Sequence, residues 1–474
     1  WYIMRDIYNV IFQEEIPKYV QISNHIKRLI ETKNIEDGEK LPTIREYTNY
    51  LGVNKVTIIN AYNKLQNDGF AYQKVGSGTY AKVKEVRRSF SKEYSRVFRK
   101  LSSGNTKDAI DFAGETNNEV VFPIEEFKSI INKVLDRDGA EALISQNALG
   151  YENLRYTINE VFWDNSIDNE SILIVSGAQQ GIDIASKAIL NINDNVIVEK
   201  PTYGGALSVF KWRRANIFEV EMEKDGVNLD GFEEILKKNR IRCFYTMSYF
   251  QNPTGISYSL EKKKKLIELA EKYDFYIIED DYLSELIYEE SVEYIPFKWL
   301  DRSDRVIYIK SFSKIFLPGI RIGYIVTPNI FRESMQNSKF NTDIATSSLM
   351  QRALELYIKD GAWKDNISYL NVEYKKRYEL MSKLIDEELG DMVTCNKPGG
   401  GLTFYLKIAD ERVTSRELFL RLSKKNVYIT PGVLFFRNMS DGDRTFRIGF
   451  SQTNEEKIKK GLKLIREELE TWHI

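Results

Sequence analysis

One stretch decides the fold of most of the chain: Lys310-Ser311-Phe312-Ser313-Lys314-Ile315-Phe316-Leu317-Pro318-Gly319-Ile320-Arg321. It follows the apolar run 306–309, which is typical of a buried strand. Ligands of open α/β sheets bind at the carboxyl ends of such strands, where Lys314 is expected to lie. Two serine hydroxyls and the guanidinium of Arg321 can share the charge of a phosphate. The stretch therefore suits a cofactor that carries both an aldehyde and a phosphate.

An isolated Ser-x-Ser-Lys motif is more often an ordinary surface lysine, so its interpretation depends on the sequence around it. From residue 110 onward, apolar strand-like runs alternate with helical segments, which predicts a doubly wound α/β domain. The predicted strands are 172–175, 196–199, 217–220, 243–247, 275–279, 306–309 and 324–327. Together they predict a large, mostly parallel sheet that can bury a cofactor at its carboxyl edge.

Polar and aromatic residues gather just after these strands. Ala178 and Gln179 open a helix whose amino end suits a phosphate, and Tyr203 can stack on a planar ring. Asn252 follows the strand 243–247. Asp280 can hold a ring nitrogen protonated, while Tyr282 can bond a phenolate oxygen. Each piece alone is weak, because an Asn-Pro-Thr-Gly run is usually only a turn, but their order along the chain favours one shared site.

The first hundred residues predict a different domain. A helix is expected over 18–31, and Thr43 with Glu46 forms a capping box for a second helix that ends at Leu51. After a three-residue turn, Asn54 caps a third helix that runs to about residue 68. Two helices joined in this way predict a helix-turn-helix, whose second helix reads the DNA major groove. The strands 70–73 and 79–83 then form a wing.

The charge of this region agrees with contacts to a polyanion. Residues 51–100 carry eleven Lys and Arg against three Asp and Glu. The residues predicted to face DNA from the third helix are Lys55, Thr57 and Asn60, and those from the wing are Lys74 and the turn at Gly76. Of these, Thr57 and Asn60 are better placed for bases, and the wing for phosphate or the minor groove. Residues 84–108 are predicted to form a basic linker. Two interpretations of this linker stay equally open: it follows the DNA phosphates, or it is only a solvated tether.

The overall composition limits which classes of protein and which kinds of site are possible. At 474 residues the chain is long enough for two or three domains, and 42% hydrophobic residues exclude a disordered protein. Its net charge of −1 indicates by itself neither nucleic acid nor membrane as a partner. Two cysteines exclude a disulfide framework, and with two histidines we expect no metal site. Without an apolar run of about 18 residues or a signal peptide, we expect a soluble cytoplasmic protein.

Resemblances to two protein families account for these observations. The stretch LPTIREYTNYLGVNKVTIINAYNKLQNDGFAYQKVGSGTY resembles the winged-helix domain of the GntR family of bacterial regulators. This resemblance implies that Arg45, Lys55, Thr57 and Gly76 contact DNA, with Arg45 also well placed for bases. Residues 110–468, with the motifs quoted above, resemble fold-type I pyridoxal-phosphate aminotransferases. A chain that fuses the two resembles the MocR subfamily of transcription regulators. The resemblance implies a winged helix-turn-helix over 10–83, the basic linker 84–108, a large cofactor domain over 109–335 and a small C-terminal α+β part over 336–474.

The resemblance also implies roles for particular residues. Lys314 would form the Schiff base with pyridoxal 5'-phosphate, and Asp280 would pair with the pyridine nitrogen. Tyr203 would stack on the ring, and Asn252 and Tyr282 would contact the oxygen atom attached to the ring. The residues around the phosphate would be Ala178, Gln179, Ser311, Ser313 and Arg321. Arg447, in the segment Thr445–Phe450, would clamp the carboxylate of a substrate or effector.

The function that follows is a transcription regulator that binds double-stranded promoter DNA and senses pyridoxal phosphate or an amino compound. The resemblance implies a homodimer with domains exchanged between chains. Gly205 stands where GABA-responsive members have an arginine, which argues against a GABA-like effector. The alternative is an active aminotransferase that carries an appended DNA-binding domain. The sequence leaves enzymatic turnover, the effector and the operator open.

Overall fold

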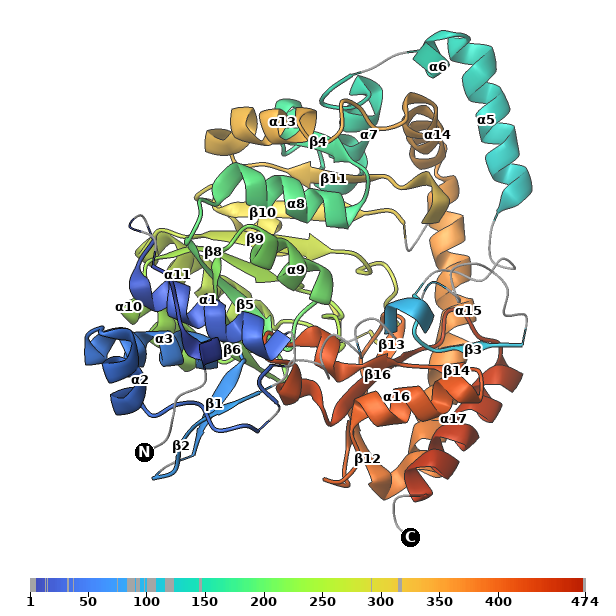
Figure 1. Ribbon diagram of the computed structural model, residues 1–474. Coiled ribbons are helices and arrows are strands. Elements are labelled where there is room, and N and C mark those ends of the chain that lie inside the picture. Colours follow the sequence, from blue (N-terminus) through green and yellow to red (C-terminus); the bar gives the residue numbers. More distant parts are fainter. Residues whose placement is uncertain are drawn as a thin grey trace. The chain divides into compact units, whose positions relative to one another are not determined.

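The computed structural model describes residues 6–12, 14, 16–31, 34–36, 38–74, 76–82, 90, 94–97, 99, 108–115, 123–144, 147–290, 292–313 and 318–471. The chain divides into two compact units, residues 1–107 and 108–474 (Figure 1). Most of the predicted linker 84–108 lies outside the described residues. No helix in the described part of the chain has the length and hydrophobicity that crossing a membrane requires.

The N-terminal unit contains the helices and the two-stranded wing that the sequence predicts. Its elements are η1 (Asp6–Tyr8), α1 (Lys18–Glu31), α2 (Ile44–Leu51), α3 (Lys55–Asn67), β1 (Ala71–Lys74) and β2 (Gly78–Ala81). The capping box is present, because the Glu46 amide donates to Thr43 Oγ1 at 3.2 Å and the Thr43 amide donates to Glu46 Oε2 at 2.9 Å. Gly52 ends α2 in the left-handed conformation, at φ 61°.

The wing strands lie about one residue away from their predicted positions. β1 and β2 pair antiparallel from Ala71 opposite Ala81 to Lys74 opposite Gly78, so that Gly78 belongs to the strand and not to the turn. One face of α3 is buried through Ile58, Ala61, Tyr62 and Leu65. The other face of α3 is therefore left outward, as a groove-reading helix requires.

The core of the C-terminal unit is an eight-stranded sheet in the order β4-β11-β10-β9-β8-β5-β6-β7. Its strands are β4 (Ile172–Val175), β5 (Asn195–Lys200), β6 (Asn216–Glu223), β7 (Gly226–Val227), β8 (Ile241–Thr246), β9 (Tyr276–Asp281), β10 (Val306–Ser311) and β11 (Gly323–Val326). β11 runs antiparallel between β4 and β10, and β7 is antiparallel to β6. The other pairs are parallel, so the carboxyl ends of β4, β5, β8, β9 and β10 share one edge.

Helices cover both faces of this sheet (Figure 1). The helices of this part of the chain are α5 (Ile124–Asp138), α6 (Glu141–Ile144), α7 (Glu152–Trp163), α8 (Ala178–Ile189), α9 (Gly204–Trp212), α10 (Leu229–Lys238), α11 (Leu260–Tyr273), α12 (Phe297–Leu300), α13 (Arg332–Phe340), α14 (Ser348–Lys359) and α15 (Ala362–Leu384). The short helices are η3 (Asn169–Ser171), η4 (Pro318–Ile320), η5 (Asn329–Phe331), η6 (Ile385–Leu389) and η7 (Gly390–Met392). α8 packs through Gly181 against Ile309, whereas α10 and α11 pack on the opposite face around Ile277 and Val306.

The C-terminal part carries a second, antiparallel sheet in the order β12-β13-β16-β15. Its elements are β12 (Val393–Asn396), β13 (Thr403–Ile408), α16 (Ser415–Lys424), β14 (Val427–Tyr428), β15 (Thr430–Pro431), η8 (Gly432–Phe435), η9 (Met439–Gly442), β16 (Thr445–Gly449) and α17 (Glu455–Glu470). β3 (Ile110–Asp111) pairs in parallel with β14, so the beginning of this unit is fixed to its C-terminal part.

Candidate functional site

A cavity of about 180 Å³ lies at the carboxyl edge of the large sheet. It is lined by Glu115, Ala178, Gln179, Tyr203, Met247, Asn252, Asp280, Tyr282, Ser311, Ser313 and Arg321. The structure thus brings together nine of the ten residues predicted to contact the cofactor. The tenth, Lys314, lies outside the described residues. Apart from Glu115, the lining residues come from five segments, which meet here because the parallel strands end at a common edge.

Hydrogen-bond donors converge at one end of the cavity. α8 begins at Ala178, directly after Gly177 at φ 90°, and its first amides face this end. The guanidinium of Arg321 lies 3.4 Å from Ser313 Oγ, and a Cβ on Gly177 would lie 3.0 Å from Arg321 Nη2. Arg321 itself has φ 50°, a conformation that non-glycine residues rarely adopt and that is concentrated at functional sites. Helix amides, hydroxyls and a guanidinium together form a suitable site for a phosphate.

Asp280 occupies the floor of the cavity with one oxygen unused. Its Oδ2 accepts a hydrogen bond from Tyr245 at 2.7 Å, whereas its Oδ1 is buried and has no hydrogen-bond partner among the described residues. Burial raises the pKa of Asp280 to about 7, and the hydrogen bond from Tyr245 opposes this only partly. A protonated pyridine nitrogen would supply the donor and the positive charge that Oδ1 lacks, so these residues fit the ring of pyridoxal phosphate.

The neighbouring Asp281 lies on the opposite face of β9, because side chains alternate along a strand. Its carboxylate is fully engaged: Lys310 lies 3.1 Å away, and the hydroxyls of Tyr294, Tyr308 and Ser284 donate at 2.6 to 2.9 Å. Burial raises the pKa of Asp281, but Lys310 and the hydroxyls outweigh it and hold the pKa below its ordinary value. Asp281 therefore stabilises the strand ends and leaves Asp280 to the cavity.

Tyr203 is held against the cavity by its neighbours. Burial, with the nearby Asp280, raises the pKa of Tyr203 to about 12, so its hydroxyl stays protonated. Gln179 Nε2 donates to the carbonyl of Gly205 at 3.2 Å, and a Cβ at Gly205 would overlap both Gln179 and the Tyr203 ring. This crowding favours glycine, over any residue with a side chain, two positions after Tyr203. Tyr282 donates to the carbonyl of Phe250 at 3.2 Å.

Arg447, predicted to hold a carboxylate, is buried beside the cavity and is already paired. Its Nη1 donates to Asn252 Oδ1 at 2.6 Å, and its Nη2 donates to the carbonyl of Ala113 at 3.2 Å. It also forms an ion pair with Glu115. Sequence reasoning missed Glu115 and Met247. A single acidic residue after a glycine carries no local signal, since its partner is fixed only by the fold.

Residues 398–402 form a loop that leads into β13. Gly399, Gly400 and Gly401 lie so close to Val292, to the Leu286 carbonyl and to Phe250 that a side chain at Gly400 would overlap backbone. The glycines therefore serve close packing in a turn.

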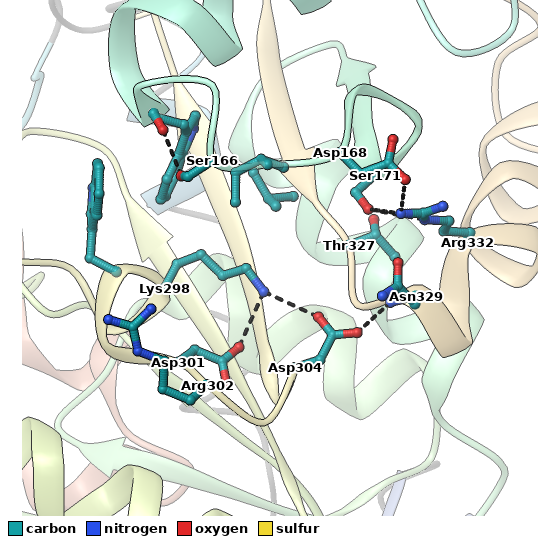
Figure 2. A pocket seen from close by; sticks show the side chains of 14 residues that line it. Ser166, Asp168, Ser171, Lys298, Asp301, Arg302, Asp304, Thr327, Asn329 and Arg332 are labelled. Atoms are coloured by element: carbon teal, nitrogen blue, oxygen red, sulfur yellow. Dashed lines mark hydrogen bonds and ion pairs between the residues drawn. The ribbon is translucent and has the colours of Figure 1, made fainter.

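A second cavity, of about 490 Å³, lies at the opposite edge of the sheet, before β10 and after β11 (Figure 2). Five of its six charged lining residues pair with one another: Lys298 Nζ lies 3.1 Å from Asp301 and 3.5 Å from Asp304, and Arg332 Nη2 lies 2.6 Å from Asp168. None of the residues predicted for the site lines it. The smaller cavity is therefore the candidate site, because its polar groups still need partners.

The predicted DNA contacts lie on the N-terminal unit. Arg45, Lys55 and Asn60 are exposed, and Thr57 is half-buried near the start of α3. On the wing, Gly76 is exposed, and Lys74 Nζ lies 4.9 Å from the centre of the Tyr80 ring. Val56 is also exposed beside them, at 58% of its full accessibility, so α3 offers an apolar contact as well as polar ones.

A winged helix-turn-helix in the same chain as an aminotransferase-like fold defines a class of protein that combines DNA binding with a cofactor fold. The chain belongs to the aminotransferase class I and II family, whose family model matches residues 106–465. Residues 18–81 match the gntR family of bacterial regulatory proteins. The architecture expected for a MocR-like regulator is thus confirmed.

Relatives of both kinds support this assignment. The chain is 32% identical over 382 residues to aromatic-amino-acid aminotransferase 1 of Thermococcus litoralis, covering 79% of this chain and 91% of that protein. It is 28% identical over 459 residues to the uncharacterized HTH-type transcriptional regulator YcxD of Bacillus subtilis, covering 95% and 100%. The solved kynurenine aminotransferase of Pyrococcus horikoshii, in complex with PMP, has a TM-score of 0.75 at 31% identity and covers 82% of this chain and 98% of its own. The family's cofactor is thus a B6 phosphate, as the sequence analysis predicted.

Proposed function

We propose that the protein is a transcription regulator that binds promoter DNA through its winged helix and senses pyridoxal phosphate, or an amino compound bound with it, in the cavity at the sheet edge. The observation that carries this proposal is the buried Oδ1 of Asp280, which has no hydrogen-bond partner in the described part of the chain and lies in a cavity beside converging phosphate donors. The full-length relatives named as transcriptional regulators support it, because they span both units.

Different residues at the cavity hold different parts of the cofactor. Asp280 holds the ring nitrogen protonated, and Tyr203 packs on the ring. The amides of α8, with Ser311, Ser313 and Arg321, bind the phosphate. When bound, pyridoxal phosphate supplies an aldehyde that condenses with primary amines, and Lys314 is the proposed resident amine. The protein works in the cytoplasm as a homodimer with exchanged domains.

DNA binding responds to the cofactor site only if two arrangements of the dimer differ in their affinity for the ligand. Bases are read by Arg45, Thr57 and Asn60, while Lys55, Lys74 and Gly76 contact the phosphate backbone. Phosphate contacts make binding depend on salt, so the affinity for any duplex falls as ionic strength rises.

The test is a visible-absorbance titration of the purified full chain with pyridoxal phosphate and then with amines, repeated with promoter DNA. We expect the wild type to take up the aldehyde, and promoter occupancy to change with the amine. Lys314→Ala should bind the cofactor without a covalent bond and lose the response of promoter occupancy. A Lys314→Ala variant that responds like the wild type would contradict the sensing role.

A second candidate is an active aminotransferase with an appended DNA-binding domain. It is favoured by the identity to named aminotransferases, including 2-aminoadipate transaminase of Thermus thermophilus, which is 29% identical over 356 residues and covers 75% of this chain and 88% of that protein. Steady-state transamination faster than roughly 1 s⁻¹ would support this candidate, since that is the lower end of ordinary enzyme rates.

A further inference from the structure

Glu115 occupies the place beside Arg447 that a ligand carboxylate would take. Its carboxylate forms an ion pair with Arg447, and Asn252 Nδ2 donates to Glu115 Oε1 at 3.3 Å. Both side chains of the pair are buried, each with 8% of its surface exposed. Glu115 also lines the cavity. Burial is the main cause of the raised pKa of Tyr203 and of Tyr282, and the negative charge of Glu115 raises both pKa values further. The internal carboxylate thus lies among the residues proposed to hold the ring.

The backbone before Glu115 is fixed to the sheet that carries Arg447. The Phe112 amide donates to the Tyr428 carbonyl at 2.9 Å, and the Gly449 amide donates to the Phe112 carbonyl at 2.7 Å. Asp111 Oδ1 accepts from the amides of Ala113 and Gly114, each at 2.9 Å, which turns the chain toward the cavity. The position of Glu115 therefore follows from the fold around it, and its side chain is directed at Arg447.

We propose that Glu115 masks Arg447 and so selects the ligands of the site: amines without a carboxylate bind to the resting site, whereas amino acids bind only by displacing Glu115. This inference rests on the proposed function, because it concerns ligands of the same site. Exchange of one carboxylate for another keeps the charge of the buried pair constant, so it avoids the large cost of an unpaired Arg447. Affinity for a carboxylate is reduced by the fraction of molecules in which Arg447 is free.

The experiment compares two ligands that differ by one carboxylate, L-phenylalanine and 2-phenylethylamine. Their dissociation constants are measured on the cofactor-loaded full chain, by visible absorbance, for the wild type and for Glu115→Gln. If the unmasked state of the wild type is populated at about 1–10%, the variant should bind L-phenylalanine roughly 10- to 100-fold more tightly. Its affinity for 2-phenylethylamine should stay within about twofold of the wild type, because no carboxylate competes.

A second measurement does not need the cofactor. Glutarate has no amine, and its binding to the full chain can be followed by calorimetry with and without pyridoxal phosphate. Glu115→Gln should strengthen glutarate binding in both states. Failure to take up pyridoxal phosphate would defeat the proposed function alone, whereas unchanged or weaker binding of glutarate and L-phenylalanine in Glu115→Gln would overturn the masking role.

Two further variants secure the comparison. Glu234→Gln removes an exposed carboxylate on α10, where it pairs only loosely with Lys238 at 3.7 Å, and should leave all three ligand affinities unchanged. Glu115→Asp keeps the charge but shortens the side chain. It replaces Glu115→Gln in the test of masking if that variant does not fold. It should move the affinity for L-phenylalanine in the same direction by a smaller factor, and an affinity equal to that of the wild type would count against masking.

Discussion

The two cavities of the α/β unit lie at opposite edges of one sheet and differ in how their charges are used. In the larger cavity, Lys298 and Arg332 are neutralised by acidic residues beside them. In the smaller cavity, Asp280 keeps a buried oxygen without a partner among the described residues, and Arg321 faces a helix amino end. A buried polar group without a hydrogen-bond partner costs free energy, which a bound ligand can remove. Such groups therefore identify a ligand site better than the volume of a cavity does.

The largest effect is expected at Asp280. Asp280→Asn removes the charge that would hold a protonated ring nitrogen, so the affinity for pyridoxal phosphate should fall roughly 30- to 1,000-fold, as for other buried charge pairs that lose one partner. Equilibrium titration of the full chain by visible absorbance measures this loss. An affinity within threefold of the wild type would show that Asp280 does not hold the ring.

The same substitution should stabilise the cofactor-free protein at high pH. The pKa of Asp280 is about 7 in the folded protein and about 3.9 when unfolded, so its contribution to stability is present below pH 4 and is lost as the pH rises through 7. At pH 8, Asp280→Asn should recover up to about 4 kcal/mol of unfolding free energy. Because Glu199 and Glu279 titrate in the same range, the difference between variant and wild type, measured by denaturant unfolding from pH 5 to 8, isolates Asp280.

The adjacent carboxylate should respond in the opposite way. Asp281→Asn removes the negative charge beside Lys310, whose remaining acidic partner is Glu285 at 2.6 Å, and replaces one of the two acceptor oxygens with an amide donor. We expect a loss of about 3–5 kcal/mol in unfolding free energy, the usual cost of breaking a buried ion pair. Denaturant unfolding at pH 7 tests this, and a variant as stable as the wild type would contradict the structural role of Asp281.

A smaller effect is expected at the phosphate end. Arg321→Lys keeps the charge but loses the planar fork of donors and must adopt the same left-handed backbone, so the affinity for pyridoxal phosphate should fall about tenfold. The affinity for pyridoxal without phosphate, measured in the same titration, should change little. Equal losses for both ligands would place Arg321 away from the phosphate.

The smallest effect is expected in the larger cavity. Arg302 is exposed there, and Arg302→Ala should change the unfolding free energy by less than about 0.5 kcal/mol, as surface substitutions usually do. Binding of pyridoxal phosphate should be unchanged. A clear loss of cofactor affinity would mean that the two edges of the sheet are coupled, and the distinction drawn between them would fail.

The sequence predicted the parts of the structure that depend on local signals. The capping box of Thr43 and Glu46 fixed the start of α2, and Gly52 fixed its end, because both act within one helical turn. The order of polar residues after the strands predicted the site, since parallel strands bring their ends together.

The parts that depend on distant contacts were not predicted. β7 is two residues long and exists through its pairing with β6, so it has no periodicity to detect. The ion pair of Glu115 with Arg447 joins the two ends of the unit, which come together through the pairing of β3 with β14 and the hydrogen bond from the Gly449 amide to the Phe112 carbonyl. Apolar and charged residues in the larger cavity likewise gave no pattern along the chain.

The alternation of side chains along β9 limits how its gene segment can evolve. Asp280 and Asp281 act on opposite faces of the strand, so a single-codon deletion before them would move Asp281 to the cavity face and Tyr282 to the face of Lys310. Such a change would point the fully bonded carboxylate into the cofactor cavity and leave Lys310 facing the wrong neighbour. Lineages can therefore vary β9 by replacing amino acids one at a time, while changes of length are confined to the loops at its ends.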